Sequence, residues 1–352
     1  MTDQAGTKEH EVRRMRASVL TGPRQLEVQE VRVPDVGSRD VLVRVEAVGV
    51  CGSDTHFYRA GRIGDLVVEG PIILGHETAG VIVDVGVEVD RARIGERVSI
   101  EPQRPCRRCD HCRNGDYNQC SDIEFYGAYP IHGSFAEFAV IPDDFAYRLP
   151  DAMTLEEGAL LEPLSVAIYA CRTGRITAGS RVLIAGAGPI GLLIAQVAFA
   201  FGAAEVSVTD PRRSRRDFAE EYAEVRGMVP AALEGVPPFA DVFIDASGAP
   251  SAIVSGVLAV HPRGRVVLVG MGMDDVTLPV SVIQHRELMV TGTFRYAHTW
   301  PLAIELASTG KVRLAPLVTS RHSLDDVESA LLAASTDPSS VKSVVVPTAM
   351  KE

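Results

Sequence analysis

Residues 182–210 read VLIAGAGPIGLLIAQVAFAFGAAEVSVTD, and this stretch decides the fold of the chain. An apolar, β-branched segment precedes a G-x-G-x-x-G turn, an apolar helical run and a second strand over 205–209. Glycines let the backbone approach a pyrophosphate, whose charge faces the start of the helix. A membrane span is disfavoured by the interior glycines and proline, and a ligand-free βαβ unit is the other alternative. The expected nucleotide turn comprises Gly186, Gly188, Pro189, Ile190 and Gly191.

An acid and a basic residue follow this turn. Asp210 ends the second strand, where a carboxylate can accept hydrogen bonds from a ribose 2′-OH. Arg215 can lie over the adenine, and an arginine after the acid is sometimes a sign of NADP. We expect NAD, because Asp210 would repel a 2′-phosphate at close range.

Composition describes a globular chain with room for more than one core. It has 352 residues, of which 46% are hydrophobic and 23% charged, enough for two domains. The formal net charge of −11 argues against nucleic acid or an anionic membrane surface as a partner. The polar first twelve residues contain no apolar signal segment, so we expect a cytoplasmic protein.

Four of the six cysteines crowd into one polar loop with the spacing C-x2-C-x2-C-x7-C. This clustering is typical of thiolates on a metal, and the spacing indicates a closed tetrahedral zinc site in a lobe over 101–122. Two disulfides are the alternative, disfavoured in a reducing compartment. The predicted structural zinc ligands are Cys106, Cys109, Cys112 and Cys120.

The first half of the chain is rich in short valine-containing strands, for example 41–50 and 81–89, which predict a partly closed β-structure. Within it lie Cys51, His76 and Glu77. A thiolate, an imidazole and a carboxylate together suit Zn²⁺ and leave a fourth position open for water or substrate. Taken singly, each has an ordinary interpretation: a lone cysteine is usually a small buried apolar residue, and a His-Glu pair is usually surface.

The motifs follow one another in a characteristic order: G75-H76-E77-x2-G80, the cysteine lobe, E162-P-L-S-V-A and G186-A-G-P-I-G191. With them the chain resembles the zinc-dependent medium-chain alcohol dehydrogenases. Within that family it is most similar to the polyol branch, the sorbitol (L-iditol) and xylitol dehydrogenases. The closer match lies in residues 51–58, 61–77, 156–172 and 291–308.

The resemblance implies an α/β fold of two domains. A GroES-like, β-rich catalytic domain would comprise residues 1–155 and 293–352, and a Rossmann NAD-binding domain, a doubly wound parallel sheet, would be inserted over 156–292. The proline-rich stretch 227–240 is short, so the third strand and helix of the Rossmann domain are expected to be abridged. Helices are expected after Pro163 and over 300–308 and 324–335.

The resemblance also assigns roles to residues. Cys51, His76 and Glu77 would hold the catalytic zinc, with Glu162 beside the metal as a direct ligand or through water. Ser53 and His56 match the proton relay of the family. Candidate substrate contacts are Tyr58, Phe125, Arg295 and Tyr296. For Arg295, a purely structural role between domains or subunits is an equal alternative.

The implied function is NAD-dependent, zinc-dependent oxidation of a secondary hydroxyl of a polyol to the ketose, and the reverse reduction. Two zinc ions per chain are expected, one catalytic and one structural. A simple secondary alcohol, a diol, L-threonine or a cyclitol is the alternative substrate, and Tyr129, larger than is usual in the polyol branch, leaves the choice open. A zinc-stabilised, non-catalytic nucleotide-binding relative is the alternative of another class. The edge segment 273–281 would pair subunits in a homo-oligomer, a tetramer or a dimer.

Overall fold

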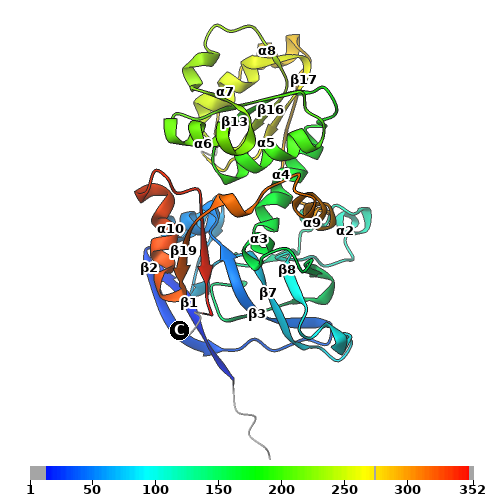
Figure 1. Ribbon diagram of the computed structural model, residues 1–352, viewed down its shortest axis with the longest axis vertical. Helices are drawn as coiled ribbons and strands as arrows, with labels where there is room; N and C mark the ends of the chain where they lie inside the picture. The colour runs from blue at the N-terminus through cyan, green and yellow to red at the C-terminus, as the bar shows by residue number, and fades with distance from the viewer. Residues whose placement is uncertain (1–12, 273–274, 349–352) are drawn as a thin grey trace, which may run out of the picture.

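The computed structural model describes residues 13–272 and 275–348. They form two lobes, with helices α4 (Leu161–Thr173) and α9 (Trp300–Ser308) between them (Figure 1). No helix within these described ranges is long and apolar enough to cross a membrane.

The lower lobe in Figure 1 is built on a sheet whose strands come from both ends of the chain. In the described residues its order is β12-β8-β7-β3-β20-β19, with β11 also paired to β3. Every pairing is antiparallel except that of β19 with β20. The bounds are β3 Asp40–Gly49, β7 Glu77–Val85, β8 Arg97–Ile100, β11 Phe138–Pro142, β12 Ala146–Arg148, β19 Val318–Ser323 and β20 Lys342–Val346.

A smaller sheet closes one side of this lobe. Its order is β2-β1-β6, over Gln25–Arg32, Arg14–Gly22 and Ile72–Ile73. Valines and isoleucines of both sheets fill a common core with the aromatic ring of Phe135. The predicted partly closed β-structure is confirmed, and the return of the chain near its C-terminal end supplies two of its strands.

The upper lobe is a parallel sheet with the order β15-β14-β13-β16-β17-β18. This is the doubly wound order in which the chain reverses direction next to the first strand, so the predicted Rossmann fold is confirmed. The bounds are β13 Arg181–Ala185, β14 Glu205–Thr209, β15 Arg226–Met228, β16 Ala240–Asp245, β17 Val260–Leu268 and β18 Met289–Gly292. The domain boundaries at 155/156 and 292/293 stay predictions.

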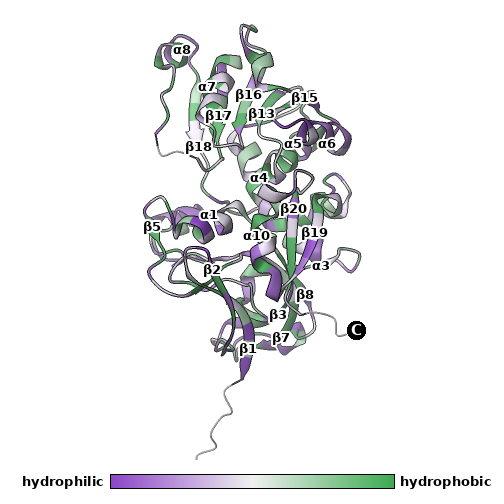
Figure 2. Ribbon diagram, turned by 90° about the vertical axis from the view of Figure 1, so that its left-hand side faces the viewer, coloured by the Kyte–Doolittle hydropathy of each residue, from purple (hydrophilic) through white to green (hydrophobic). Residues whose placement is uncertain are grey.

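The abridged stretch expected over 227–240 is also present. Strand β15 has three residues, and a single 3-10 turn over Pro230–Leu233 stands where a helix would otherwise connect two strands. The other helices around the sheet are α5 Pro189–Ala200, α6 Arg213–Ala223, α7 Pro250–Ala259 and α8 Val280–His285. Helix α5 is buried and apolar, whereas α6 is hydrophilic and lies on the outside (Figure 2).

Three helices differ from the expectations or add to them. Helix α4 begins at Leu161, before the proline, which places Glu162 in its first turn. Helix α10 (Val327–Thr336) follows a 3-10 turn over Leu324–Asp326, so the predicted helix is divided. Short helix α1 (Gly52–Ala60) was not predicted. Of the edge segment expected over 273–281, residues 273–274 lie outside the described ranges, and 280–281 open α8.

The nucleotide turn depends on the absence of a side chain at two positions. Gly186 has φ +100°, a left-handed conformation that favours glycine. A Cβ at Gly191 would lie 1.8 Å from the carbonyl oxygen of Gly186, whereas one at Gly188 would meet nothing closer than the flexible Arg215 at 3.4 Å. Helix α5 can therefore pack this closely against the turn only because Gly191 has no side chain.

We predict that Gly191→Ala destabilises the upper lobe by about 1–3 kcal/mol, because two backbone segments must separate to admit the methyl group. Thermal unfolding measures this loss. Gly188→Ala is the matched control and should cost less than about 1 kcal/mol. Equal melting temperatures for the two variants would contradict the packing described for this turn.

Candidate active site

Three predicted zinc ligands meet where two strands of the lower sheet end. Cys51 follows β3 and precedes α1, while Glu77 opens β7 opposite Gly49 of β3. Donor atoms of Cys51, His76 and Glu77 all lie within 4.8 Å of one another. One sulfur, one imidazole and one carboxylate at this separation match the donor set of a zinc site that keeps an open position.

The carboxylate of Glu77 is fully buried, and its two oxygens have different surroundings. Its Oε1 accepts a hydrogen bond of 2.5 Å from Nζ of Lys342, which is also buried. Its Oε2 has no hydrogen-bond partner among the described residues, and a Cβ at Gly49 would lie 2.0 Å from it. A buried carboxylate oxygen without a partner is costly, and a metal ion beside Cys51 and His76 would satisfy it.

Lys342, in strand β20, was not predicted from the sequence. Its Nζ also donates to the carbonyl oxygen of Val50, at 2.8 Å. Burial alone would lower the pKa of Lys342, but the negative charges of Glu77 and Cys51 outweigh it and hold that pKa above its ordinary value. The lysine is therefore a fixed positive charge behind the zinc ligands.

Asp54 is a second residue that sequence reasoning missed. Its carboxylate is buried and accepts hydrogen bonds from the backbone N–H groups of Cys51 (3.0 Å) and Gly75 (3.1 Å). It also lies 3.5 Å from Nδ1 of His76. Because Nδ1 faces this carboxylate, Nε2 is the nitrogen left for a metal. The signal in the sequence was the spacing of an acid three residues after Cys51, which is typical of a carboxylate that caps the start of a helix.

Glu162 lies near the three ligands but outside the set whose donor atoms are within 4.8 Å. It is buried, and its Oε1 accepts a hydrogen bond of 2.7 Å from the hydroxyl of Tyr296. Burial raises the pKa of Glu162 to about 7, opposed by the charge of His76 and the bond from Tyr296. Its carboxylate is thus held at one oxygen by Tyr296, near enough to His76 and Glu77 for their charges to act on its pKa.

The structure brings Arg295 and Phe125 to the same place. The Arg295 guanidinium stacks 3.8 Å above the Phe125 ring, whose centroid lies 5.3 Å from that of His76. Nη1 of Arg295 is buried with no hydrogen-bond partner in the described part of the chain. Burial lowers the pKa of Arg295 to about 10, so the guanidinium stays charged at neutral pH. It therefore has a donor to spare beside a zinc ligand.

Not every predicted site residue joins this group. The Tyr58 side chain is packed in the core of the lower lobe, and its hydroxyl donates to Glu328 of α10, so the expectation that it faces substrate is not supported. Ser53 and His56 lie one turn apart on α1, directly after Cys51. Their relay role stays a prediction.

The cysteine lobe forms a second metal site. The four sulfurs lie within 4.8 Å of one another, and those of Cys106 and Cys112 are 4.0 Å apart, close to the roughly 3.8 Å that a tetrahedron of Zn–S bonds requires. Backbone N–H groups point at the sulfurs; Cys109 N–H, for example, donates to Cys106 at 3.4 Å. These donors lower the pKa of Cys106 to about 6 and favour the thiolate that zinc binds. The alternative of two disulfides is not supported, because the described cysteines are all free thiols.

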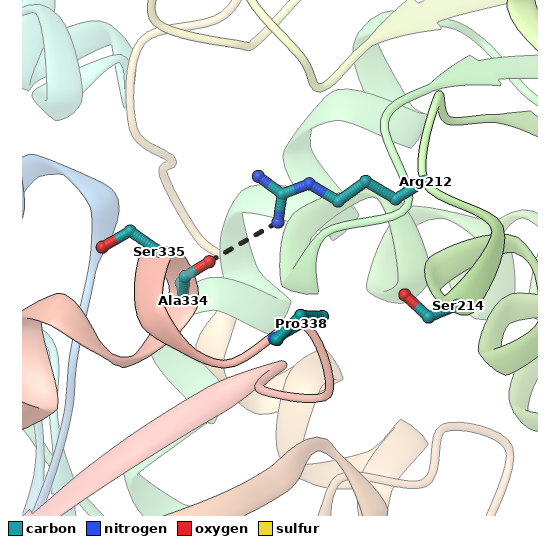
Figure 3. Close-up of a pocket in the computed structure, with 5 residues that line it drawn as sticks. All are labelled: Arg212, Ser214, Ala334, Ser335 and Pro338. Carbon is teal, nitrogen blue, oxygen red and sulfur yellow. Dashed lines mark hydrogen bonds between the residues drawn. The ribbon is translucent and has the colours of Figure 1, made fainter.

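At the nucleotide turn, Asp210 lies where the sequence predicted. Its carboxylate accepts hydrogen bonds from the backbone N–H groups of Ala187 (3.1 Å) and Arg212 (2.8 Å). Arg215 is close to Gly188. Beside them a hollow of about 310 Å³ lies between the start of α6 and the end of α10, with the Arg212 guanidinium directed at the carbonyl of Ala334 (Figure 3).

Comparison with protein families gives two matches along the chain. The family model for the alcohol dehydrogenase GroES-like domain matches residues 37–151. The model for the zinc-binding dehydrogenase domain matches residues 189–309. Their order is the one that the resemblance implied.

Among curated proteins, Probable D-xylulose reductase A of Aspergillus fumigatus (strain CBS 144.89 / FGSC A1163 / CEA10) is 40% identical over 89% of this chain and 91% of its own length. Sorbitol dehydrogenase of Mus musculus is 41% identical over 87% of this chain and 89% of its own length. Both alignments cover most of each chain.

A solved structure, described as a short chain alcohol dehydrogenase from E. coli CFT073 complexed with the cofactor NADH, superposes with a TM-score of 0.88. It is 29% identical and covers 95% of this chain and 99% of its own. Taken with the two domain matches and the two zinc-binding donor sets, these similarities show that the chain belongs to the zinc-dependent medium-chain dehydrogenases, in the branch of D-xylulose reductase and sorbitol dehydrogenase.

Proposed function

We propose that this protein uses zinc and NAD to oxidise a secondary hydroxyl of a polyol to the ketose, and catalyses the reverse reduction. The observation that carries the proposal is the convergence of Cys51, His76 and Glu77 with the buried, unpaired Nη1 atom of Arg295. Relatives named D-xylulose reductase and sorbitol dehydrogenase support the substrate class.

When bound, zinc would supply Lewis acidity that favours loss of the substrate hydroxyl proton, and NAD would accept hydride. Cys51, His76 and Glu77 would hold the metal, with Lys342 keeping one oxygen of Glu77 occupied. Glu162, directed by Tyr296, would hold water or the hydroxyl beside the metal. Ser53 and His56 would then pass the proton along α1 toward solvent.

The polyol is favoured over a simple secondary alcohol by the guanidinium of Arg295. A buried N–H without an acceptor is unfavourable, and a second hydroxyl on the substrate would provide one. A diol, L-threonine or a cyclitol also carries a second polar group and remains the alternative. The aromatic face of Phe125 fixes the guanidinium plane and so the direction of its donors.

NAD is the proposed cofactor because the Asp210 carboxylate lies at the glycine turn, where it would repel a 2′-phosphate. The nearby Arg215 would then cover the adenosine end of the cofactor. The choice of NAD and the role of Arg215 are the same as those predicted from the sequence.

We further propose a homo-oligomer, a dimer or a tetramer. In the part of the chain that the structure describes, β18 is an edge strand paired only with β17. Met289 on β18 is 51% exposed and Val280 on α8 is 60% exposed. An open edge with apolar side chains favours pairing with a second copy. The cytoplasmic location stays a prediction.

The direct test is a panel of sugar alcohols, inositols and simple diols with NAD, followed by absorbance of the reduced cofactor. We predict a kcat/KM for an acyclic polyol that exceeds that for propan-2-ol by about tenfold or more, the value of one well-placed hydrogen bond to a charged group. Cys51→Ser serves as the inactive control. Propan-2-ol oxidised as well as the polyols would contradict the assigned substrate class, and no turnover of any compound would favour a non-catalytic relative.

The buried ion pair makes a prediction for the metal-free protein. Lys342→Met should lower its free energy of unfolding by about 3–5 kcal/mol, because Glu77 is left charged and buried without a partner. Urea denaturation after chelation measures the change. The double variant Lys342→Met/Glu77→Gln should regain most of the loss; a single variant as stable as the wild type would show that the pair is not formed.

The cofactor assignment is tested with Asp210→Ala. Removing the carboxylate should reduce the preference for NAD over NADP, measured as the ratio of kcat/KM values, by about tenfold or more, since one repulsive contact of roughly 1.4 kcal/mol corresponds to a factor of ten. The melting temperature monitors the lost acceptor for Ala187 and Arg212. An unchanged ratio would show that another residue selects the cofactor.

A further inference from the structure

We propose that the cysteine lobe, residues 106–120, is a positioning element of the active site as well as a stabilising one. It fixes the segment 294–298, from which Arg295 and Tyr296 reach the zinc ligands and Glu162. The effect on substrate rests on the proposed function, whereas the effect on the segment does not.

The segment 294–298 has a backbone that needs external support. It runs from the last strand of the upper sheet to α9, and Arg295 and His298 have φ values of +53° and +54°. These left-handed conformations are unfavourable for residues other than glycine, and they persist only where the surroundings hold them. Contacts made by the segment should therefore reveal what determines its shape.

The lobe holds both ends of the segment. At the first end, Nδ2 of buried Asn118 donates to the carbonyl oxygen of Phe294, at 2.8 Å. At the second, the backbone N–H of His298 donates to the hydroxyl of Tyr117, at 2.8 Å. The His298 ring packs edge-on against Tyr117, with centroids 4.9 Å apart, and its Nε2 bonds to the carbonyl oxygen of Gly115 at 2.9 Å.

The middle of the segment is held through a buried acid that the lobe also contacts. Gln103 donates to the carbonyl oxygen of Tyr296 at 3.2 Å and to Glu101 at 3.0 Å. Tyr117 donates its hydroxyl proton to the same Glu101, at 2.7 Å. One hydroxyl, that of Tyr117, thus accepts from the segment and donates to the acid that anchors the centre.

These contacts lead directly to the catalytic group. Tyr296, held through its carbonyl, donates its hydroxyl proton to Glu162, and the adjacent Arg295 stacks on Phe125 beside His76. Figure 1 shows α2 (Asp110–Asn114) of the lobe beside the start of α9, on the outside of the molecule. The lobe therefore supports the active site from behind.

Metal bound to the four sulfurs would make this support possible. Over residues 106–120, only Tyr117, Asn118 and Cys120 are buried, and the first two of these contact the segment. A loop with so little apolar core depends on its cross-link for shape. Zinc bound to the four sulfurs would thus set the position of side chains near the other zinc.

The chain contains its own reporter for this coupling. Its single tryptophan, Trp300, lies two residues after the segment and is fully buried. The Trp300 ring lies 5.2 Å from that of Tyr296, and its Nε1–H donates to the hydroxyl of Ser99 at 3.0 Å. Tryptophan emission therefore follows the packing around Tyr296 without any substrate.

The test compares two tyrosines, Tyr117 and Tyr147, whose hydroxyl groups both donate to the carboxylate of Glu101. Tyr117→Phe removes a hydroxyl that joins the segment to Glu101, while Tyr147→Phe removes one that donates to Glu101 at 3.1 Å and makes no hydrogen bond to 294–298. We expect Tyr117→Phe to lower kcat/KM for the polyol by about 10- to 100-fold, as a displacement of about 1 Å would. Activity on propan-2-ol should fall less, because that substrate depends on the Tyr296–Glu162 contact but does not need Arg295. Tyr147→Phe should change neither.

The substrate-free readout is the emission of Trp300 in Tyr117→Phe and in Cys109→Ser, the latter with its zinc content measured. Both should shift the emission maximum relative to the wild type. Tyr147→Phe, which keeps its ring stacked 5.8 Å from the Trp300 ring, should shift the maximum less than either. His298→Phe, which keeps the ring contact but loses the bond to Gly115, provides the same comparison if Tyr117→Phe does not fold.

Two results would overturn the proposal. One is a loss of kcat/KM on each substrate that is the same in Tyr117→Phe as in Tyr147→Phe. The other is tryptophan emission in Cys109→Ser identical to that of the wild type. If the wild-type protein oxidises no polyol, the proposed function fails, and the emission shifts still decide whether the lobe positions the segment.

Discussion

The buried carboxylate of Glu77 is the feature on which the active site depends. It lies between a lysine that neutralises one oxygen and a space in which Cys51 and His76 direct their own donors. Burying an acid is strongly unfavourable unless both oxygens are satisfied, so the arrangement requires positive charge on each side. Lys342 supplies one charge, and zinc is the group that the remaining donors fit.

This requirement explains why the lower lobe is built from both ends of the chain. Strand β20 carries Lys342 into the sheet beside β3, which ends two residues before Cys51, while β7 opens with Glu77 on the other side of β3. These three neighbouring strands thus place the zinc ligands and the positive charge of Lys342 at the same end of the sheet. Helix α4, which lies between the two lobes, then brings Glu162 to the same place with its first turn.

Local patterns predicted the parts of the structure that depend on local chemistry. The glycine turn and the four-cysteine loop have fixed local spacings, whereas the zinc role of Cys51, His76 and Glu77 was implied by the resemblance; the structure brings each set together. Asp54 escaped because helix α1, which places it, was not predicted, and Lys342 escaped because it is a lysine in a strand, 265 positions away from its partner Glu77. Tyr58 was assigned to the substrate because of its place in a motif, but its hydroxyl bonds to Glu328, a contact made only in the folded chain.

The central claim is that the chain contains two zinc sites of different kinds, and metal content tests it most directly. Elemental analysis of the purified protein, combined with stepwise chelation, should find about two zinc ions per chain. One of them should be lost in Cys51→Ser and the other in Cys109→Ser. A single zinc per chain that survives Cys51→Ser would contradict the account, because the donors around Glu77 would then hold no metal.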